Sequence, residues 1–133
     1  MTATTDQKDA KRQNTVIAVD AMGGDSGPSA IVAGCAAFAK RRKDVDIILH
    51  GPQATLEALV LRRKQLNGRV TIRDAAEVVS MEDKPSQVVR HGKKTSMWAT
   101  VETVRSGDAG VAVSCGTTGA LMAVSMIRLR NLP

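Results

Sequence analysis

Residues 20–29 form a glycine-rich turn with two acids, and they are the residues in this sequence best placed to do chemistry. The turn follows the apolar run 15–19, which is typical of a buried strand, and precedes residues 30–42, whose pattern predicts a helix. Such a turn is where α/β proteins bind ligands, often anions. Asp20 and Asp25 would repel a bare phosphate. We therefore expect the two acids to line the site beside the ligand. Each carboxylate could orient a donor, bind a cation or act as a base. For Asp25 the alternative is a structural role, in which its carboxylate caps the helix.

A second glycine-rich loop, Ser114–Ala120, also runs from a predicted strand into a predicted helix. Its glycines let backbone N–H groups approach an anion, its hydroxyl groups add donors, and the helix start supplies a favourable dipole. It lacks the Gly-Lys-Ser/Thr ending of a P-loop, and the first turn lacks the Gly-x-Gly-x-x-Gly fingerprint of nicotinamide binding. For each loop, a tight turn that binds nothing is the alternative.

Other candidates lie near these loops. Cys115 sits close to a helix start, which would lower the pKa of its thiol and favour a nucleophile. Neither histidine is placed to activate it, so we interpret it as a small buried residue. Arg90, Lys93 and Ser96 precede a predicted helix and are candidates for anion contacts, with a solvated charged segment as the simpler alternative.

Strands and helices alternate along the chain. The predicted strands cover residues 15–20, 45–50, 69–73 and 109–114, and the predicted helices cover 30–42, 52–67, a short segment from Pro85, 95–105 and 120–129. This alternation predicts an α/β fold, a three-layer, doubly wound and mostly parallel sheet with helices on both faces. Right-handed crossovers bring both glycine-rich loops to one sheet edge. The last helix is apolar on most faces, so we expect it to be buried between layers.

The composition suits one domain, with 133 residues of which 43% are hydrophobic. Residues 1–14 are polar and lack the apolar core of a signal peptide, which predicts a disordered tail on a cytoplasmic protein. The two cysteines form no C-x-x-C pair and there are only two histidines, so no metal site is predicted.

The formal net charge of +6 comes largely from basic clusters. Residues 40–43 and 62–64 lie at the ends of predicted helices, where cations complement the helix dipole. An acidic partner is the functional alternative. Nucleic acid is disfavoured because Phe38 and Trp98 are the only aromatic residues available for stacking.

Taken together, three segments resemble the bacterial phosphate acyltransferase family of phospholipid synthesis. Residues 19–28 are similar to its opening motif, residues 81–97 to its middle motif, and residues 114–122 to its Gly-Asn-Thr-Gly-Ala loop. Members are more than twice this length, so residues 15–133 are predicted to be the amino-terminal part of a single α/β domain. Thr117 stands where the family has asparagine, which puts the role of that side chain in question.

The resemblance implies a reaction and a setting. A fatty acyl group moves reversibly from the thioester of acyl carrier protein to inorganic phosphate, and the acyl phosphate feeds a membrane glycerol-3-phosphate acyltransferase. It implies no cofactor, a homodimer, a cytoplasmic location with peripheral membrane contact left open, and a fold similar to that of isocitrate/isopropylmalate dehydrogenases and phosphotransacetylases.

In such a reaction the phosphate is itself the nucleophile, so the site must hold the dianion near the thioester and stabilise the developing oxyanion. Thr117, Thr118 and Asp25 are the predicted catalytic residues. The predicted substrate- and phosphate-binding residues are Gly116, Gly119, Asp20, Gly23, Gly24, Arg90, Lys93 and Ser96.

Three other functions stay open. One is a phosphate acyltransferase that uses acyl-CoA, of the phosphotransacetylase kind. Another is a dehydrogenase of the similar fold, which binds its cofactor without the Gly-x-Gly-x-x-Gly fingerprint. The third is an inactive or purely binding fragment, because a site shared with missing residues cannot turn over.

Overall fold

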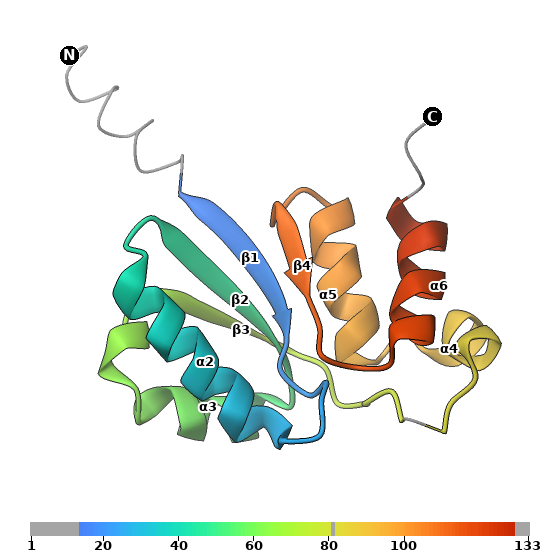
Figure 1. Cartoon of the computed structure of the whole chain (residues 1–133), viewed down its shortest axis with the longest axis horizontal. Helices are drawn as coiled ribbons and strands as arrows, with labels where there is room; N and C mark the ends of the chain where they lie inside the picture. The colour runs from blue at the N-terminus through green and yellow to red at the C-terminus, as the bar shows by residue number, and fades with distance from the viewer. Residues whose placement is uncertain (1–13, 81, 130–133) are drawn as a thin grey trace, which may run out of the picture.

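Four parallel strands form the centre of the structure, a computed structural model that describes residues 14–80 and 82–129 (Figure 1). The strand order is β3-β2-β1-β4. The strands are β1 (Thr15–Asp20), β2 (Val45–Gly51), β3 (Val70–Asp74) and β4 (Val111–Val113). All three pairings are parallel, as the alternation of strands and helices predicts.

Helices cover both faces of this sheet, which confirms the predicted α/β architecture (Figure 1). One face carries α2 (Gly27–Arg41), α3 (Gln53–Leu61) and the short 3-10 helix η1 (Lys64–Leu66). The other side carries α4 (Pro85–His91), α5 (Ser96–Arg105) and α6 (Thr118–Leu129). Of these, α5 packs directly on the sheet, whereas α6 packs against α4 and α5.

Local sequence signals set several helix ends. Pro28 lies in the first turn of α2, where its missing N–H and fixed φ are tolerated. Lys40 and Arg41 lie in the last turn of α2, where their charges favour the dipole. Thr95 caps α5, since its hydroxyl oxygen accepts a 3.2 Å hydrogen bond from the Trp98 N–H.

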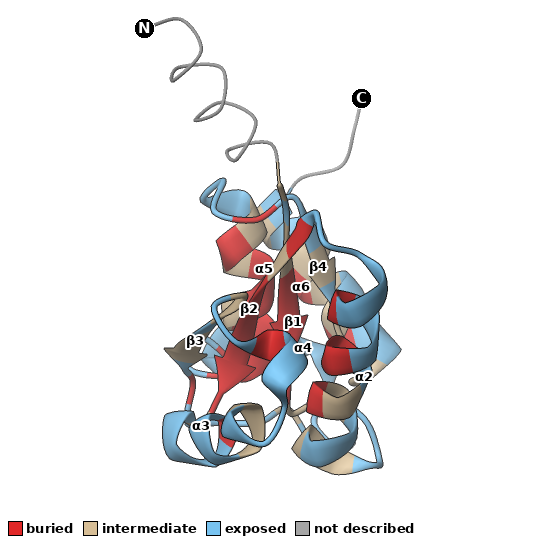
Figure 2. Cartoon of the chain, turned by 90° about the vertical axis from the view of Figure 1, so that its left-hand side faces the viewer, coloured by how far each residue is buried: buried red, intermediate tan, exposed pale blue. Residues whose placement is uncertain are grey.

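The buried apolar residues form two clusters, and Figure 2 shows buried positions gathered on the central strands and on the helix faces turned toward them. The first cluster, between the sheet and α2, α3 and η1, contains Val19, Ala21, Val32, Cys35, Ala36, Ala39, Val45, Ile47, Leu49, Leu56 and Leu66. The second joins α4, α5 and α6 through Val88, Met97, Trp98, Val101, Ala120 and Val124. The first cluster thus packs on one face of the sheet, and α5 of the second cluster contacts the other.

The prediction that α6 is buried between layers is wrong for the residues that the structure describes. Only Ala120 and Val124 of this helix are buried, while Met122, Met126 and Ile127 are each more than half exposed. The reason is that α4 and α5 cover one side of α6 and no described element covers the other. An apolar surface is therefore open along this helix.

Two boundaries also differ from the predictions. The helix expected over 52–67 divides into α3 and η1, and Gly68 follows with a φ of 73°. The strand expected over 109–114 is confined to Val111–Val113, because its ladder with β1 holds only Ile17, Ala18 and Val19.

The predicted tail, residues 1–14, lies outside the described residues except for Asn14. Among the described helices, none combines the length and the apolar character needed to cross a bilayer.

Candidate functional site

Both glycine-rich loops lie at the carboxyl edge of the sheet, as the crossover rule predicts. Because β1 and β4 are parallel neighbours with Val19 opposite Val113, the loops that follow them start side by side. Gly23 touches the second loop so closely that a Cβ atom there would lie 2.6 Å from the Gly116 nitrogen. The structure thus brings the two predicted motifs into one site.

Asp20 is the most buried acid of this edge, at 2% exposure. Its Oδ1 accepts a 3.0 Å hydrogen bond from the Met22 N–H, and its Oδ2 accepts one of 2.8 Å from the Ser114 hydroxyl. Both carboxylate oxygens are therefore bound to donors within the protein. This geometry agrees with an orienting role for Asp20 rather than direct contact with an anion.

The rest of the first loop is open. Gly24 has a φ of 97°, and a Cβ atom there would lie 3.0 Å from the Cβ of Cys115. Asp25 is exposed, and the N-cap of α2 is Ser26, which makes no side-chain capping bond. The alternative in which Asp25 caps the helix is therefore not observed, and the catalytic role predicted for Asp25 stays a prediction.

The second loop leads into the amino-terminal end of α6. The Leu121 N–H donates to the Thr117 carbonyl at 3.0 Å, so the N–H groups of Thr118, Gly119 and Ala120 lie ahead of the first such bond. The Thr117 hydroxyl oxygen is buried and has no hydrogen-bond partner among the described residues. This helix end offers backbone donors, a hydroxyl group and a positive dipole.

Ser96 is the buried member of the middle segment. It is 1% exposed at the start of α5, and its hydroxyl oxygen has no hydrogen-bond partner in the part of the chain described. The neighbouring Met97 packs against the second loop, since a Cβ atom on Gly116 would lie 2.7 Å from its terminal methyl carbon. The start of α5 thus contacts the second loop through Met97, and a contact of Ser96 with an anion stays a prediction. Arg90 and Lys93 are exposed, and a contact with an anion stays a prediction for both.

The two cysteines differ in a way that the sequence did not indicate. Cys115 is exposed, so the interpretation of it as a small buried residue is wrong. It follows β4, which pairs with β1 at an edge of the sheet that the described residues form. Cys35 is buried in the core, and burial raises the pKa of its thiol to about 11.

Comparison with known proteins places these motifs in a family. The family model described as "Fatty acid synthesis protein" matches residues 15–133. This chain belongs to that family. The match covers all three segments that carried the predicted resemblance.

Curated relatives in the fatty acid synthesis protein family are called phosphate acyltransferases. The one from Roseobacter denitrificans is 61% identical over 133 residues, which is 100% of this chain and 37% of that protein. The Ruegeria pomeroyi protein is also 61% identical, over 100% of this chain and 36% of its own length. The Paracoccus denitrificans protein is 63% identical over 118 residues, covering 89% and 32%. The chain therefore spans about a third of the length of these curated relatives, and the resemblance inferred from the motifs is confirmed.

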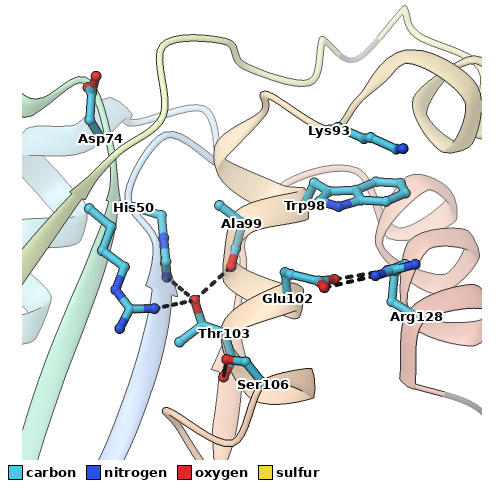
Figure 3. Close-up of a pocket in the computed structure, with 10 residues that line it drawn as sticks. His50, Asp74, Lys93, Trp98, Ala99, Glu102, Thr103, Ser106 and Arg128 are labelled. Atoms are coloured by element: carbon cyan, nitrogen blue, oxygen red, sulfur yellow. Dashed lines mark hydrogen bonds and ion pairs between the residues drawn. The ribbon is translucent and has the colours of Figure 1, made fainter.

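This member of the fatty acid synthesis protein family has a further hollow of about 510 Å³ between β2, β3 and α5, which the sequence reasoning missed (Figure 3). Its lining residues are His50, Arg73, Asp74, Lys93, Trp98, Ala99, Glu102, Thr103, Ser106 and Arg128. Lys93, predicted to bind the anion, lines this hollow. The alternation of side chains along β2 was the available signal, because it places His50 level with Asp20 on the same face.

His50 is buried at the floor of that hollow. Its Nε2 lies 3.0 Å from the hydroxyl oxygen of Thr103, and this hydroxyl also lies 2.8 Å from the Ala99 carbonyl, to which it donates (Figure 3). We infer that His50 Nε2 carries the proton and donates to Thr103. Burial, and secondly the charge of Arg73, lower the pKa of His50 to about 4, so the ring is neutral at pH 7.

Proposed function

We propose that this chain supplies the phosphate-binding part of an enzyme that transfers a fatty acyl group from acyl carrier protein to inorganic phosphate. Family membership and the name of the relatives, phosphate acyltransferase, support the reaction class. The acyl donor follows from the motif resemblance and from the family's description as a fatty acid synthesis protein.

One observation carries the assignment of phosphate to the second loop. The N–H groups at the start of α6 precede the first hydrogen bond of the helix, and the buried Thr117 hydroxyl oxygen at the same helix end has no hydrogen-bond partner among the described residues. Donors without acceptors are the complement of a phosphate dianion, and the helix dipole favours its charge. Asp20 does not compete for these N–H groups, because its two oxygens accept from other donors, the Met22 N–H and the Ser114 hydroxyl.

The chemistry needs no covalent enzyme intermediate. An oxygen of HPO4²⁻ attacks the thioester carbonyl, the new C–O bond forms, and the C–S bond breaks. The proton of the phosphate passes to the departing sulfur, giving an acyl phosphate dianion and the free thiol. The protein has to hold the two reactants in line and to offer donors to the oxyanion that forms on the carbonyl. In this proposal Thr117 and Thr118 supply those donors, and Gly116 and Gly119 allow the loop to pack closely against Met97 and Pro85.

In this proposal the remaining predicted residues have supporting roles around the second loop. Gly23 and Gly24 allow the first loop to approach the second, and Asp25 is available to a substrate donor because it is exposed. Arg90 in the last turn of α4 and Lys93 just before α5 supply positive charge in this segment.

The extent of the domain, its fold likeness, its location and its partners are also proposals. Coverage of about a third of the relatives supports the interpretation of residues 15–133 as the amino-terminal part of a longer α/β domain. The parallel sheet supports, without specifying, the likeness to isocitrate/isopropylmalate dehydrogenases and phosphotransacetylases. A cytoplasmic homodimer, peripheral membrane contact, and delivery of acyl phosphate to a membrane glycerol-3-phosphate acyltransferase rest on the resemblance alone.

The test uses a full-length enzyme, a protein of the relatives' length that carries this sequence at its amino-terminal end. Release of the carrier thiol from acyl carrier protein is measured with and without inorganic phosphate, and acyl-CoA is assayed in parallel. We expect phosphate-dependent release with the carrier protein. Preference for acyl-CoA, or release that is independent of phosphate, would contradict the proposal.

Three variants locate the site. Thr118→Ala and Thr117→Val each remove one hydroxyl group, and we expect the KM for phosphate to rise by up to about tenfold, which is the cost of one hydrogen bond. Thr117→Asn restores the residue that the resemblance places there and is expected to keep activity. Unchanged phosphate kinetics in both hydroxyl-free variants would refute the assignment to this loop.

A further inference from the structure

Asp20, the last residue of β1, lies level with Ser114, the first residue after β4. Val19 is the partner of Val113 in the parallel ladder, so the next residues along, Asp20 and Ser114, fall at the same level on the same face. The Ser114 hydroxyl then reaches Asp20 Oδ2 at 2.8 Å. The acid of the first loop is thus joined to the strand that leads into the second loop.

A directed chain of hydrogen bonds continues from this pair. The Gly116 N–H donates to the Ser114 hydroxyl oxygen at 3.1 Å, and the Ser114 hydroxyl donates its own hydrogen to Asp20. The Met22 N–H donates to the other carboxylate oxygen. All three hydrogen bonds therefore run in the direction of Asp20, whose carboxylate accepts from a donor in each loop.

This series of hydrogen bonds also distinguishes the backbone N–H groups of the second loop that are already bonded within the protein from those that could bind an anion. The Gly116 N–H already has an acceptor within the protein, the Ser114 hydroxyl oxygen. Position 116 is also closely packed, because a Cβ atom on Gly116 would lie 2.7 Å from the Met97 methyl carbon and 3.3 Å from the Ser114 hydroxyl oxygen. The donors that follow, at the start of α6, are the ones left for an anion.

We propose that Ser114 is a positioning residue for the phosphate site, acting through Gly116. Its hydroxyl turns the Gly116 peptide inward and so sets the path by which Thr117 and Thr118 enter the helix. Asp20 is the anchor: its charge fixes the direction of the Ser114 hydroxyl, and it needs no contact with phosphate to do so. This inference rests on the proposed function, since it assigns Ser114 a part in binding the same anion.

Substitution of Ser114 tests the role in the full-length enzyme. Ser114→Ala leaves the Gly116 N–H without its acceptor, and we expect the KM for phosphate to rise about tenfold while the KM for the acyl donor changes less than about twofold. Ser114→Thr keeps the hydroxyl group and is expected to restore the KM for phosphate to within about threefold of the original value. Ser106→Ala is the matched control, because it removes a hydroxyl group that bonds the Thr103 carbonyl at the far end of α5.

A spectroscopic measurement separates positioning from general destabilisation. In enzyme labelled with ¹⁵N-glycine, Ser114→Ala is expected to speed hydrogen exchange at the Gly116 amide and leave the Gly110 amide, which donates to the Val16 carbonyl at 3.0 Å, unchanged. An unaltered KM for phosphate in Ser114→Ala would overturn the inference. So would equal rises in both KM values, or faster exchange at both amides. If the unsubstituted enzyme releases no thiol in response to phosphate, the proposed function itself is overturned.

Discussion

A Cβ atom placed on Gly23 would lie 2.6 Å from the backbone nitrogen of Gly116. The same atom would lie 3.0 Å from Asp20 Oδ2 and 3.1 Å from the Ser114 hydroxyl oxygen. The two loops therefore meet backbone to backbone, at a separation that no side chain can occupy. Position 23 is glycine because of space, whereas position 24 is glycine because of its positive φ.

The change Gly23→Ala tests this packing. The nearest obstacle is backbone, which cannot move aside as a flexible side chain can, so we expect a loss of about 1–3 kcal/mol in the free energy of unfolding. Gly34→Ala is the matched control, because a Cβ atom there meets nothing within 4 Å and the residue lies inside α2. The control is expected to gain up to about 1 kcal/mol from helix propensity. Urea unfolding measures both, and equal effects would contradict the packing argument.

The buried His50 makes stability depend on pH. Its pKa falls from 6.5 to about 4 in the folded state, so the unfolded chain binds more protons between these values. The stability contributed by the neutral ring is present above pH 6.5 and is lost as the pH falls toward 4. We expect the free energy of unfolding to drop by about 2 kcal/mol between pH 7 and pH 5 on account of this residue.

The variant His50→Gln separates this effect from other titrations. Its side-chain amide keeps a donor for Thr103 but cannot take up a proton in this range. Denaturant titrations at pH 7 and pH 5 should show a smaller fall in stability for this variant than for the original chain. An identical fall in both proteins would show that His50 does not govern the pH dependence.

Thiol labelling distinguishes the two cysteines. Cys115 is exposed and Cys35 is buried with a raised pKa, so iodoacetamide at neutral pH should modify Cys115 alone until the chain is unfolded. If phosphate binds the second loop, added inorganic phosphate should slow the reaction, and added chloride at equal ionic strength should not. Mass spectrometry after digestion gives the rate at each position. Comparable labelling of Cys35 in the folded chain would contradict the burial.

The basic cluster after α3 allows a test for an acidic partner. Arg62, Arg63 and Lys64 are exposed, and replacing all three by alanine is expected to weaken binding of acyl carrier protein to the full-length enzyme several-fold at low salt. The difference should vanish near 1 M salt, where the Debye length is about 3 Å. The triple change Lys40, Arg41 and Lys43 to alanine alters the net charge equally and serves as the control. Equal weakening by both triple variants would show that only total charge matters.

Sequence reasoning succeeded where a pattern is local. The apolar run before Asp20 and the proline after Gly27 are enough to predict β1 and the start of α2, and parallel topology then places both loops at one edge. It failed where the outcome depends on what packs against a segment. The pattern of α6 cannot reveal that, among the described elements, α4 and α5 cover only one side, and the pattern around Cys115 cannot reveal that β4 is an edge strand of the described sheet.

The site itself was predicted as two motifs but not as a connected structure. The loops were identified by their glycines, whereas the part played by Ser114 emerges only from the register between β1 and β4. His50 escaped notice for the same reason, since a lone histidine in an apolar strand has no local signature. A parallel ladder aligns residues far apart in sequence, and that alignment is not encoded in either strand alone.

The hydrogen bond between Asp20 and Ser114 joins residues separated by 94 positions in the chain. A contact of that separation closes one of the longest loops the molecule contains, so it forms only after β4 has docked beside β1. The docking of β4 therefore decides when the two glycine-rich loops meet. A chain in which α2, β2 and β3 are already in place still lacks the contact that joins the two glycine-rich loops.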